Sequence, residues 1–276
     1  MIYGAIGYSI LGESEIFKDI EIILLADQHD EPTSICTSDD GKIVPSVLIS
    51  EYLKKLLHKN YVVLIEEIPY DGELVGLWED SVHVKNIRKF YLLYKHHKLY
   101  KNNIVAFDIR LDIIQNFDKN YSDEKILQDY INKIYEFCIF KLNILQHIPL
   151  YSNKIDKSIL RDCYFKILNN FTYFIKIHKD YLHLKIKDIP NNKEIYNTID
   201  TLLSDIIEFF CVLSIYNMII NNNKKFVVYC GLYHIENIQQ ILLKYFKFNL
   251  LKTYGTMSMK KIINHAHNNM CVNLSY

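Results

Sequence analysis

The 276-residue chain lacks the sequence features that mark several common classes of protein. It has only 8 glycines and 5 prolines, and they form neither a linker nor a glycine-rich phosphate-binding loop. Its 32 basic residues balance its 32 acidic residues, so it lacks the basic excess of a dedicated nucleic-acid-binding protein. The motifs H-E-x-x-H and G-x-S-x-G are also absent. We therefore expect no nucleic-acid partner, although a local basic patch is compatible with these totals.

Arginine is scarce as well, since Arg88, Arg110 and Arg161 are the only ones. Lysine, asparagine, isoleucine and tyrosine are abundant, and their codons are rich in A and T. This bias indicates an AT-rich genome, such as those of many viruses and some bacteria. Runs of lysine and asparagine therefore carry little functional weight, whereas an isolated arginine at a strand end is a candidate functional residue.

The six cysteines are scattered without any C-x-x-C pair: Cys36, Cys138, Cys163, Cys211, Cys230 and Cys271. This spacing predicts free thiols in a reducing compartment instead of a disulfide framework or zinc knuckle. No signal peptide is apparent, and Glu208 and Asn217 interrupt the apolar stretch 206–220, which predicts no membrane span. We expect a soluble cytoplasmic protein.

The order of apolar runs predicts an α/β fold. Strands are expected at 21–26, 61–65, 104–107, 225–229 and 250–254. Helices are expected at 46–58, 82–100 and 234–246, and the block 123–221 is almost wholly helical, with helices near 123–146, 157–179 and 193–221. The pattern predicts one α/β domain over 1–276, with a mainly parallel central sheet flanked by helices. The block 123–221 is then a helical insertion or cap before the last strands.

Polar residues follow four of the predicted strands, namely Asp27 and His29, Glu66 and Glu67, Asp108 and Arg110, and Gly231 and His234. In a parallel sheet these strand ends lie on one edge, where open α/β folds place their ligands. Gly231 is expected to permit a tight turn before the helix that carries His234. Each residue also has a structural interpretation, as a helix cap, a solvated loop residue or half of an Arg–Asp pair.

Two histidines and a carboxylate at one edge indicate a site for a divalent metal, such as Zn, Mn or Co. The predicted ligands are His29, His234, Glu66 and Asp27. The predicted catalytic residues are Glu66 or Glu67, Arg110 and His234. Only one of the two glutamates is expected to face the site, because consecutive strand residues point to opposite faces, and Glu66 is slightly favoured.

The two histidine segments resemble the G-x-x-H motifs of the superfamily that includes erythromycin esterase, ChaN, TraB and TIKI proteins. Gly231-Leu232-Tyr233-His234 matches the second motif in full, and Ala26-Asp27-Gln28-His29 matches the first with alanine in place of glycine. Glu66 or Glu67 and Arg110 fall where the superfamily has an acidic residue and an arginine. The resemblance runs from about residue 20 to 256 and implies an α/β fold with inserted helices.

The resemblance and the strand-end residues together favour a metal-dependent hydrolase of peptide or ester bonds, acting on a small molecule or a peptide. A metal-free esterase with a histidine base oriented by a glutamate is a variant of this hypothesis. The alternative is a non-catalytic binding or structural protein that retains a degraded hydrolase fold, which the alanine at position 26 favours. A metallophosphoesterase, suggested by Asp27-x-His29, is a weaker third hypothesis.

Overall fold

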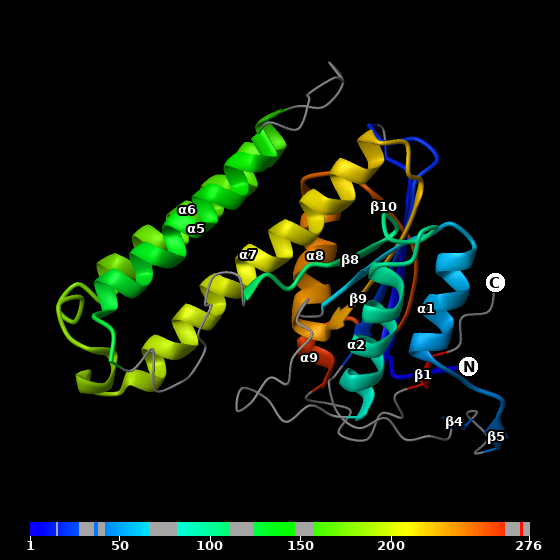
Figure 1. Ribbon diagram of the computed structural model, residues 1–276, viewed down its shortest axis with the longest axis horizontal. Helices are drawn as coiled ribbons and strands as arrows, with labels where there is room; N and C mark the ends of the chain where they lie inside the picture. The colour runs from blue at the N-terminus through cyan, green and yellow to red at the C-terminus, as the bar shows by residue number, and fades with distance from the viewer. Residues whose placement is uncertain are drawn as a thin grey trace. The chain divides into compact units, whose positions relative to one another are not determined.

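The structure, a computed structural model, describes residues 1–14, 16–27, 36–37, 42–66, 82–110, 124–146, 157–262 and 271–272. The chain forms two compact units (Figure 1). Unit 1 comprises Met1–Asp71, Asp80–Asp108 and Ser214–Tyr276, and unit 2 comprises Gly72–Glu79 and Ile109–Leu213. The predicted strand-end residues therefore divide between the two units, because Arg110 belongs to unit 2.

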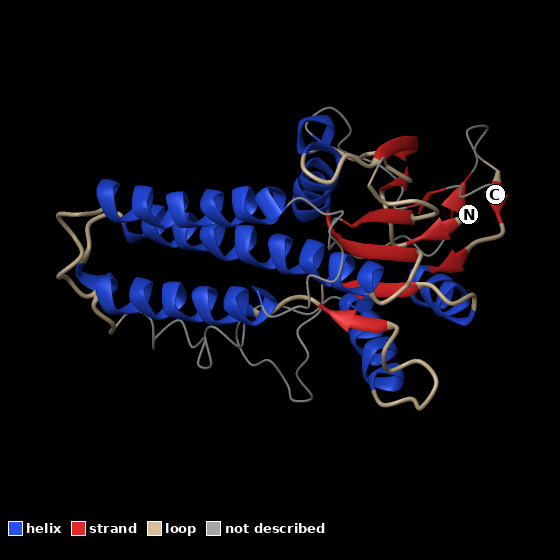
Figure 2. Ribbon diagram, turned by 90° about the horizontal axis from the view of Figure 1, so that it is seen from above, coloured by secondary structure: helices blue, strands red, loops and turns tan. Residues whose placement is uncertain are grey.

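Unit 1 is built on a six-stranded sheet with the strand order β10-β2-β3-β9-β7-β8. The strands are β2 (Gly7–Gly12), β3 (Glu21–Asp27), β7 (Val62–Ile65), β8 (Ile104–Ala106), β9 (Lys225–Gly231) and β10 (Asn249–Gly255). The four strands β3, β9, β7 and β8 are parallel, whereas β2 and β10 are antiparallel to their neighbours. These pairings confirm the prediction of an α/β fold with a mainly parallel sheet. Figure 2 shows the helices in blue and the strands in red.

Helices cover both faces of this sheet. The helices α1 (Ile49–His58) and α2 (Val82–Lys95) pack on one face, where Leu25, Ile65 and Tyr229 belong to a common buried cluster with them. The helix α8 (Leu232–Lys244) contacts β3 and β9. The central strands are buried over nearly their whole length, which explains why they appear in the sequence as unbroken apolar runs.

Two of the predicted element boundaries are wrong. Val47 and Leu48 form the short strand β6 (Val47–Leu48) instead of the first turn of a helix. They pair in parallel with β1 (Ile2–Tyr3), near the start of the chain. The strand β1 also pairs with β11 (Cys271–Val272), in the antiparallel direction. The second error is α2, which ends at Lys95 and not at residue 100.

The prediction of six free thiols is also wrong, because Cys36 and Cys271 form a disulfide. Cys36 lies in β4 (Cys36–Thr37), which pairs with β5 (Ile43–Val44). Disulfides persist in oxidising compartments, so this bond does not fit the expected reducing cytoplasm. Sequence spacing missed the pair because its members are 235 residues apart and are joined only by the fold.

The described part of unit 2 is helical. It contains α5 (Leu127–Gln146), α6 (Lys157–Ile177), the short 3-10 helix η1 (Ile186–Asp188) and α7 (Asn192–Ile220) as far as Leu213. Among the helices that the structure describes, α7 is the one that is long and apolar enough to cross a membrane. However, 67% of its most apolar 18-residue window is buried inside the protein. That burial is typical of the core helix of a soluble protein, in agreement with the expected absence of a membrane span.

Candidate functional site

Glu66 lies at the carboxyl edge of the sheet, directly after β7. Its backbone N–H donates to the carbonyl oxygen of Tyr229 at 3.0 Å, so it continues the pairing of β7 with β9. Only 6% of its side chain is exposed. A carboxylate with so little access to water requires partners within the protein, and two of them come from the start of α8.

The two oxygens of the Glu66 carboxylate contact different groups of the segment that opens α8. Oε1 lies 3.3 Å from Nε2 of His234, and Oε2 accepts a hydrogen bond of 2.8 Å from the backbone N–H of Gly231. His234 is the third residue of α8, and its side chain is 9% exposed. The structure therefore brings together two residues that are 168 positions apart, on the buried side of a strand end and a helix start.

The local sequence explains why Glu66 is held there. Gly231 is the N-cap residue of α8 and has no side chain to accept a hydrogen bond from the first helical N–H groups. The carboxylate from the neighbouring strand provides an acceptor for the Gly231 N–H itself. A negative charge is also favourable at the positive end of a helix dipole. The same contacts thus stabilise the start of the helix and orient the imidazole.

The geometry defines which nitrogen of His234 faces which partner. A carboxylate accepts hydrogen bonds, so a neutral imidazole in this position would carry its proton on Nε2, toward Glu66, and its lone pair on Nδ1. The ring of Tyr233 lies edge-on to the imidazole, with 5.4 Å between the centroids. A carboxylate that fixes one imidazole nitrogen leaves the other in a defined direction, which suits a general base or a metal-binding histidine.

A second buried carboxylate, Asp27, ends the neighbouring strand and is 1% exposed. It pairs in register with Gly231, and it hydrogen-bonds the fully buried hydroxyl of Tyr229. The same hydroxyl donates to the carbonyl oxygen of Gly4 at 2.9 Å, so its single proton is shared between two acceptors. Burial first, and then the charge and hydrogen bond of Asp27, raise the pKa of Tyr229 well above its usual value. Sequence reasoning missed Tyr229, because its place in an apolar run looked like simple packing.

Asp27 and Glu66 approach this edge from opposite faces of the sheet. Asp27 follows Leu25 by two positions and so shares its face, whereas Glu66 directly follows Ile65, which lies on that same face with Leu25. This alternation explains why Asp27, Glu66 and His234 do not form a cluster suited to a metal. Among the residues that the structure describes, no three His, Cys, Asp or Glu side chains are grouped in that way.

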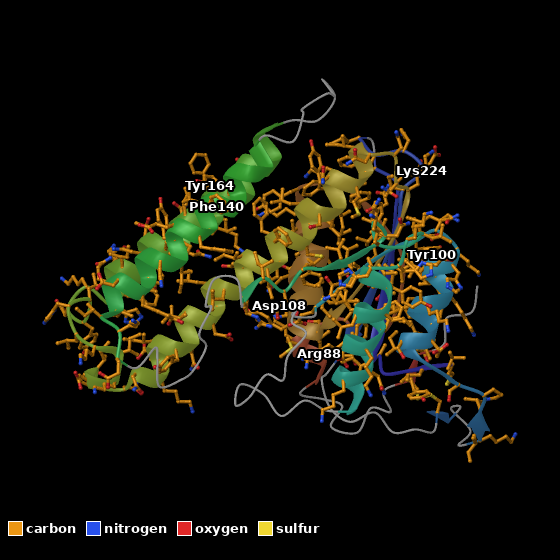
Figure 3. All side chains as sticks on the ribbon, in the orientation of Figure 1. Arg88, Tyr100, Asp108, Phe140, Tyr164 and Lys224 are labelled. Carbon is orange, nitrogen blue, oxygen red and sulfur yellow. A yellow bond between two sulfur atoms is a disulfide. The ribbon has the colours of Figure 1, made fainter. Side chains whose placement is uncertain are left out.

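The other predicted site residues have different outcomes. His29 and Glu67 lie outside the described residues, so the metal set and the choice between the two glutamates stay predictions. Asp108 is buried at the end of β8, at the same edge as Glu66, and is labelled in Figure 3. Arg110 is partly buried and belongs to unit 2, so its role beside Glu66 and His234 also stays a prediction.

The conformation of Gly231 differs from the expected tight turn. Its φ of −53° and ψ of 145° are accessible to any amino acid. The backbone therefore does not require glycine at this position, and the contribution of Gly231 is the N–H that it donates to Glu66.

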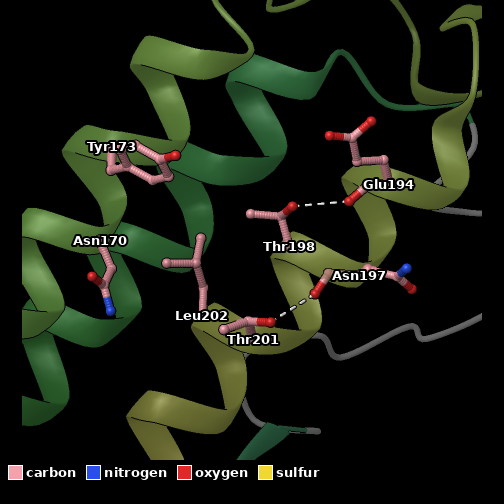
Figure 4. A pocket seen from close by; sticks show the side chains of 7 residues that line it. All are labelled: Asn170, Tyr173, Glu194, Asn197, Thr198, Thr201 and Leu202. Carbon is pink, nitrogen blue, oxygen red and sulfur yellow. Dashed lines mark hydrogen bonds between the residues drawn. The ribbon is translucent and has the colours of Figure 1, made fainter.

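A pocket of about 310 Å³ lies apart from these residues, within unit 2 between α6 and α7 (Figure 4). Its lining consists of Asn170, Tyr173, Glu194, Asn197, Thr198, Thr201 and Leu202. The hydroxyls of Thr198 and Thr201 donate to backbone carbonyls of their own helix, as the dashed lines in Figure 4 show. None of the predicted catalytic or metal-binding residues lines this pocket.

Comparison of the chain with protein-family models, curated proteins and solved structures gave no match. The resemblance to the erythromycin esterase, ChaN, TraB and TIKI superfamily consequently stays a prediction based on the two histidine motifs.

Proposed function

We propose that the protein is a hydrolase of ester or peptide bonds in which His234 is the base and Glu66 orients it. The observation that carries the proposal is the buried contact of 3.3 Å between Glu66 Oε1 and His234 Nε2, at the carboxyl edge of a mainly parallel sheet. This edge is where α/β folds of this type place their chemistry.

The chemistry follows from the tautomer. Nδ1 of His234 removes a proton from a water molecule as the water oxygen attacks the carbonyl carbon of the substrate. Glu66 stabilises the imidazolium that forms, and the ring then returns the proton to the alcohol or amine that leaves. The products are a carboxylic acid and an alcohol or amine. Stabilisation of the oxyanion by Arg110 stays a prediction from the sequence, because Arg110 belongs to unit 2.

A divalent metal is the second element of the hypothesis, and the described donor set fits it only in part. A catalytic zinc site uses three protein ligands, whereas both oxygens of Glu66 already contact His234 and Gly231. Glu66 therefore suits the role of a partner that orients a metal-binding histidine better than that of a direct ligand. Nδ1 of His234 would be one ligand, and His29 is the proposed second.

The test is hydrolysis of a panel of p-nitrophenyl esters and a peptide library by wild type, His234→Ala and Glu66→Gln. Loss of a general base is expected to lower kcat/KM by about 100-fold or more. His183→Ala, at an exposed position of unit 2, is the matched control and is expected to retain full activity. Treatment with a metal chelator separates the two versions of the mechanism, because only the metal-dependent one loses activity. Equal hydrolysis by wild type and His234→Ala would overturn the proposal.

A non-catalytic binding protein is the second candidate, and one observation favours it. Glu66 accepts the N–H of Gly231, the N-cap residue of α8, so a structural role at the start of the helix is enough to explain its presence. In that case Glu66→Ala lowers the midpoint of thermal unfolding, and no substrate in the panel is hydrolysed by the folded wild type.

A further inference from the structure

The basic residues of unit 1 are concentrated in two stretches that contain no acidic residue. Residues 52–62 contain three lysines, and residues 85–107 contain five lysines and one arginine, without a single Asp or Glu in either stretch. The chain as a whole is neutral, so this is a local separation of charge. A surface of one sign attracts a partner of the opposite sign.

Ring contacts join these two stretches in space, at the amino edge of the sheet. The imidazole of His58, in the last turn of α1, stacks on the ring of Tyr100 with 5.1 Å between centroids. His97 lies 4.9 Å from the same ring, in the turn between α2 and β8. Tyr94 is buried beside them and contacts all three rings. Figure 3 labels Tyr100, which marks the centre of this cluster.

Exposed lysines lie close in sequence to the residues of the ring cluster. We use the term lysine surface for Lys55, Lys59, Lys98 and Lys101 together with Leu93 and Leu99. All four lysines are exposed, and none forms an ion pair with a described residue. Their charges are therefore available to an external anion.

Two leucines of the same region are exposed to an unusual degree. Leu99 is 73% exposed and Leu93 is 65% exposed. Leu99 stands between Lys98 and Lys101 in a turn that is fixed by its own N–H, which donates to Nδ1 of His97 at 3.3 Å. Lysines beside exposed leucines and tyrosine rings are the composition of protein surfaces that lie at a membrane interface.

We propose that the lysine surface binds the anionic headgroups of a lipid bilayer and that Leu99 enters the interfacial region of that bilayer. The leucines distinguish this partner from a nucleic acid, since phosphate recognition in a nucleic acid gives them no role. The ring of Tyr100 is already in contact with His58 and His97, so it is a poor platform for stacking a base. The four lysines provide the diffuse attraction that acidic lipids require.

Flotation of the full chain with vesicles tests this proposal. Vesicles of phosphatidylcholine alone are compared with vesicles that also contain phosphatidylserine, at low and at physiological salt. Wild type is expected to float only with the acidic vesicles. The double variant Lys98→Gln/Lys101→Gln is expected to bind them roughly 30-fold more weakly, since each lysine near the surface contributes about fivefold. Leu99→Ser is expected to bind about tenfold more weakly.

The control is Lys176→Gln/Lys179→Gln, which removes the same charge from exposed positions at the end of α6 and should bind like wild type. Circular dichroism verifies that every variant is folded, which is expected because all the substituted side chains are exposed. Equal binding to neutral vesicles, or unchanged binding by the Lys98/Lys101 variant, would overturn the proposal. Binding of single-stranded RNA by wild type and Leu99→Ser alike, without flotation, would assign the surface to a nucleic acid instead.

Discussion

Removal of the Cys36–Cys271 disulfide is expected to destabilise unit 1 strongly. The bond joins residues 235 positions apart, and a cross-link that closes so long a loop restricts the unfolded chain severely. The chain-entropy relation gives about 5.5 kcal/mol at 25 °C for a loop of this length, while native disulfides of small domains typically contribute about 2–5 kcal/mol. We therefore expect the double variant Cys36→Ser/Cys271→Ser to lose about 2–5 kcal/mol of the free energy of unfolding.

Urea denaturation followed by circular dichroism measures this loss, with each single variant as a control. Each single variant should lose as much as the double variant, because either substitution removes the same bond. Wild type treated with dithiothreitol should shift by a similar amount. Alkylation of the denatured, unreduced protein should detect two fewer thiols than alkylation after reduction. An equal number of thiols before and after reduction would refute both the bond and the argument for an oxidising compartment.

Three further substitutions test packing in the two units. Tyr229→Phe should lower the free energy of unfolding by about 1–3 kcal/mol in urea denaturation, because the buried Gly4 carbonyl loses its donor. The raised pKa of Tyr229 also means that wild type loses stability as the pH rises above about 10, and the variant should lose less. Gly7→Ala should lower the melting temperature in calorimetry, because the added Cβ would lie 2.2 Å from the carbonyl oxygen of Thr256. Burial lowers the pKa of His178, so wild type loses stability as the pH falls below about 6.5. The urea midpoint should therefore decrease less for His178→Phe than for wild type when the pH is lowered through this value.

The strands that run through the centre of the sheet were predictable because burial on both faces leaves a signature in the sequence. The runs at 21–26 and 225–229 are apolar throughout, and the structure has β3 and β9 there. The strand β2 was missed, since Gly7 and Gly12 at its ends and Ser9 within it weaken that signature. Gly7 is explained only by its partner, the backbone at Thr256, which approaches too closely to allow a side chain.

Pairings between distant segments were beyond the reach of sequence patterns. Val47 and Leu48 continue the apolar spacing of α1, yet they form a strand because β1 lies beside them. The same limit applies to the disulfide, whose second cysteine is brought next to β1 by β11. In each case local periodicity supported one structure and a partner far along the chain selected another.

The candidate site followed from a single topological rule, namely that the ends of parallel strands share an edge. That rule was sufficient to place Glu66 near His234, but the hydrogen bond to Gly231 could not be deduced from it. This hydrogen bond also bears on the interpretation of Ala26, which stands in place of glycine in the first histidine motif. Gly231 has a conformation that alanine adopts freely, and it acts through a backbone N–H that alanine also possesses. If the glycine of the first motif acts in the same way, alanine at position 26 retains the N–H that such a role requires. Hydrolysis assays of His234→Ala therefore test the choice between enzyme and binding protein more directly than the missing glycine does.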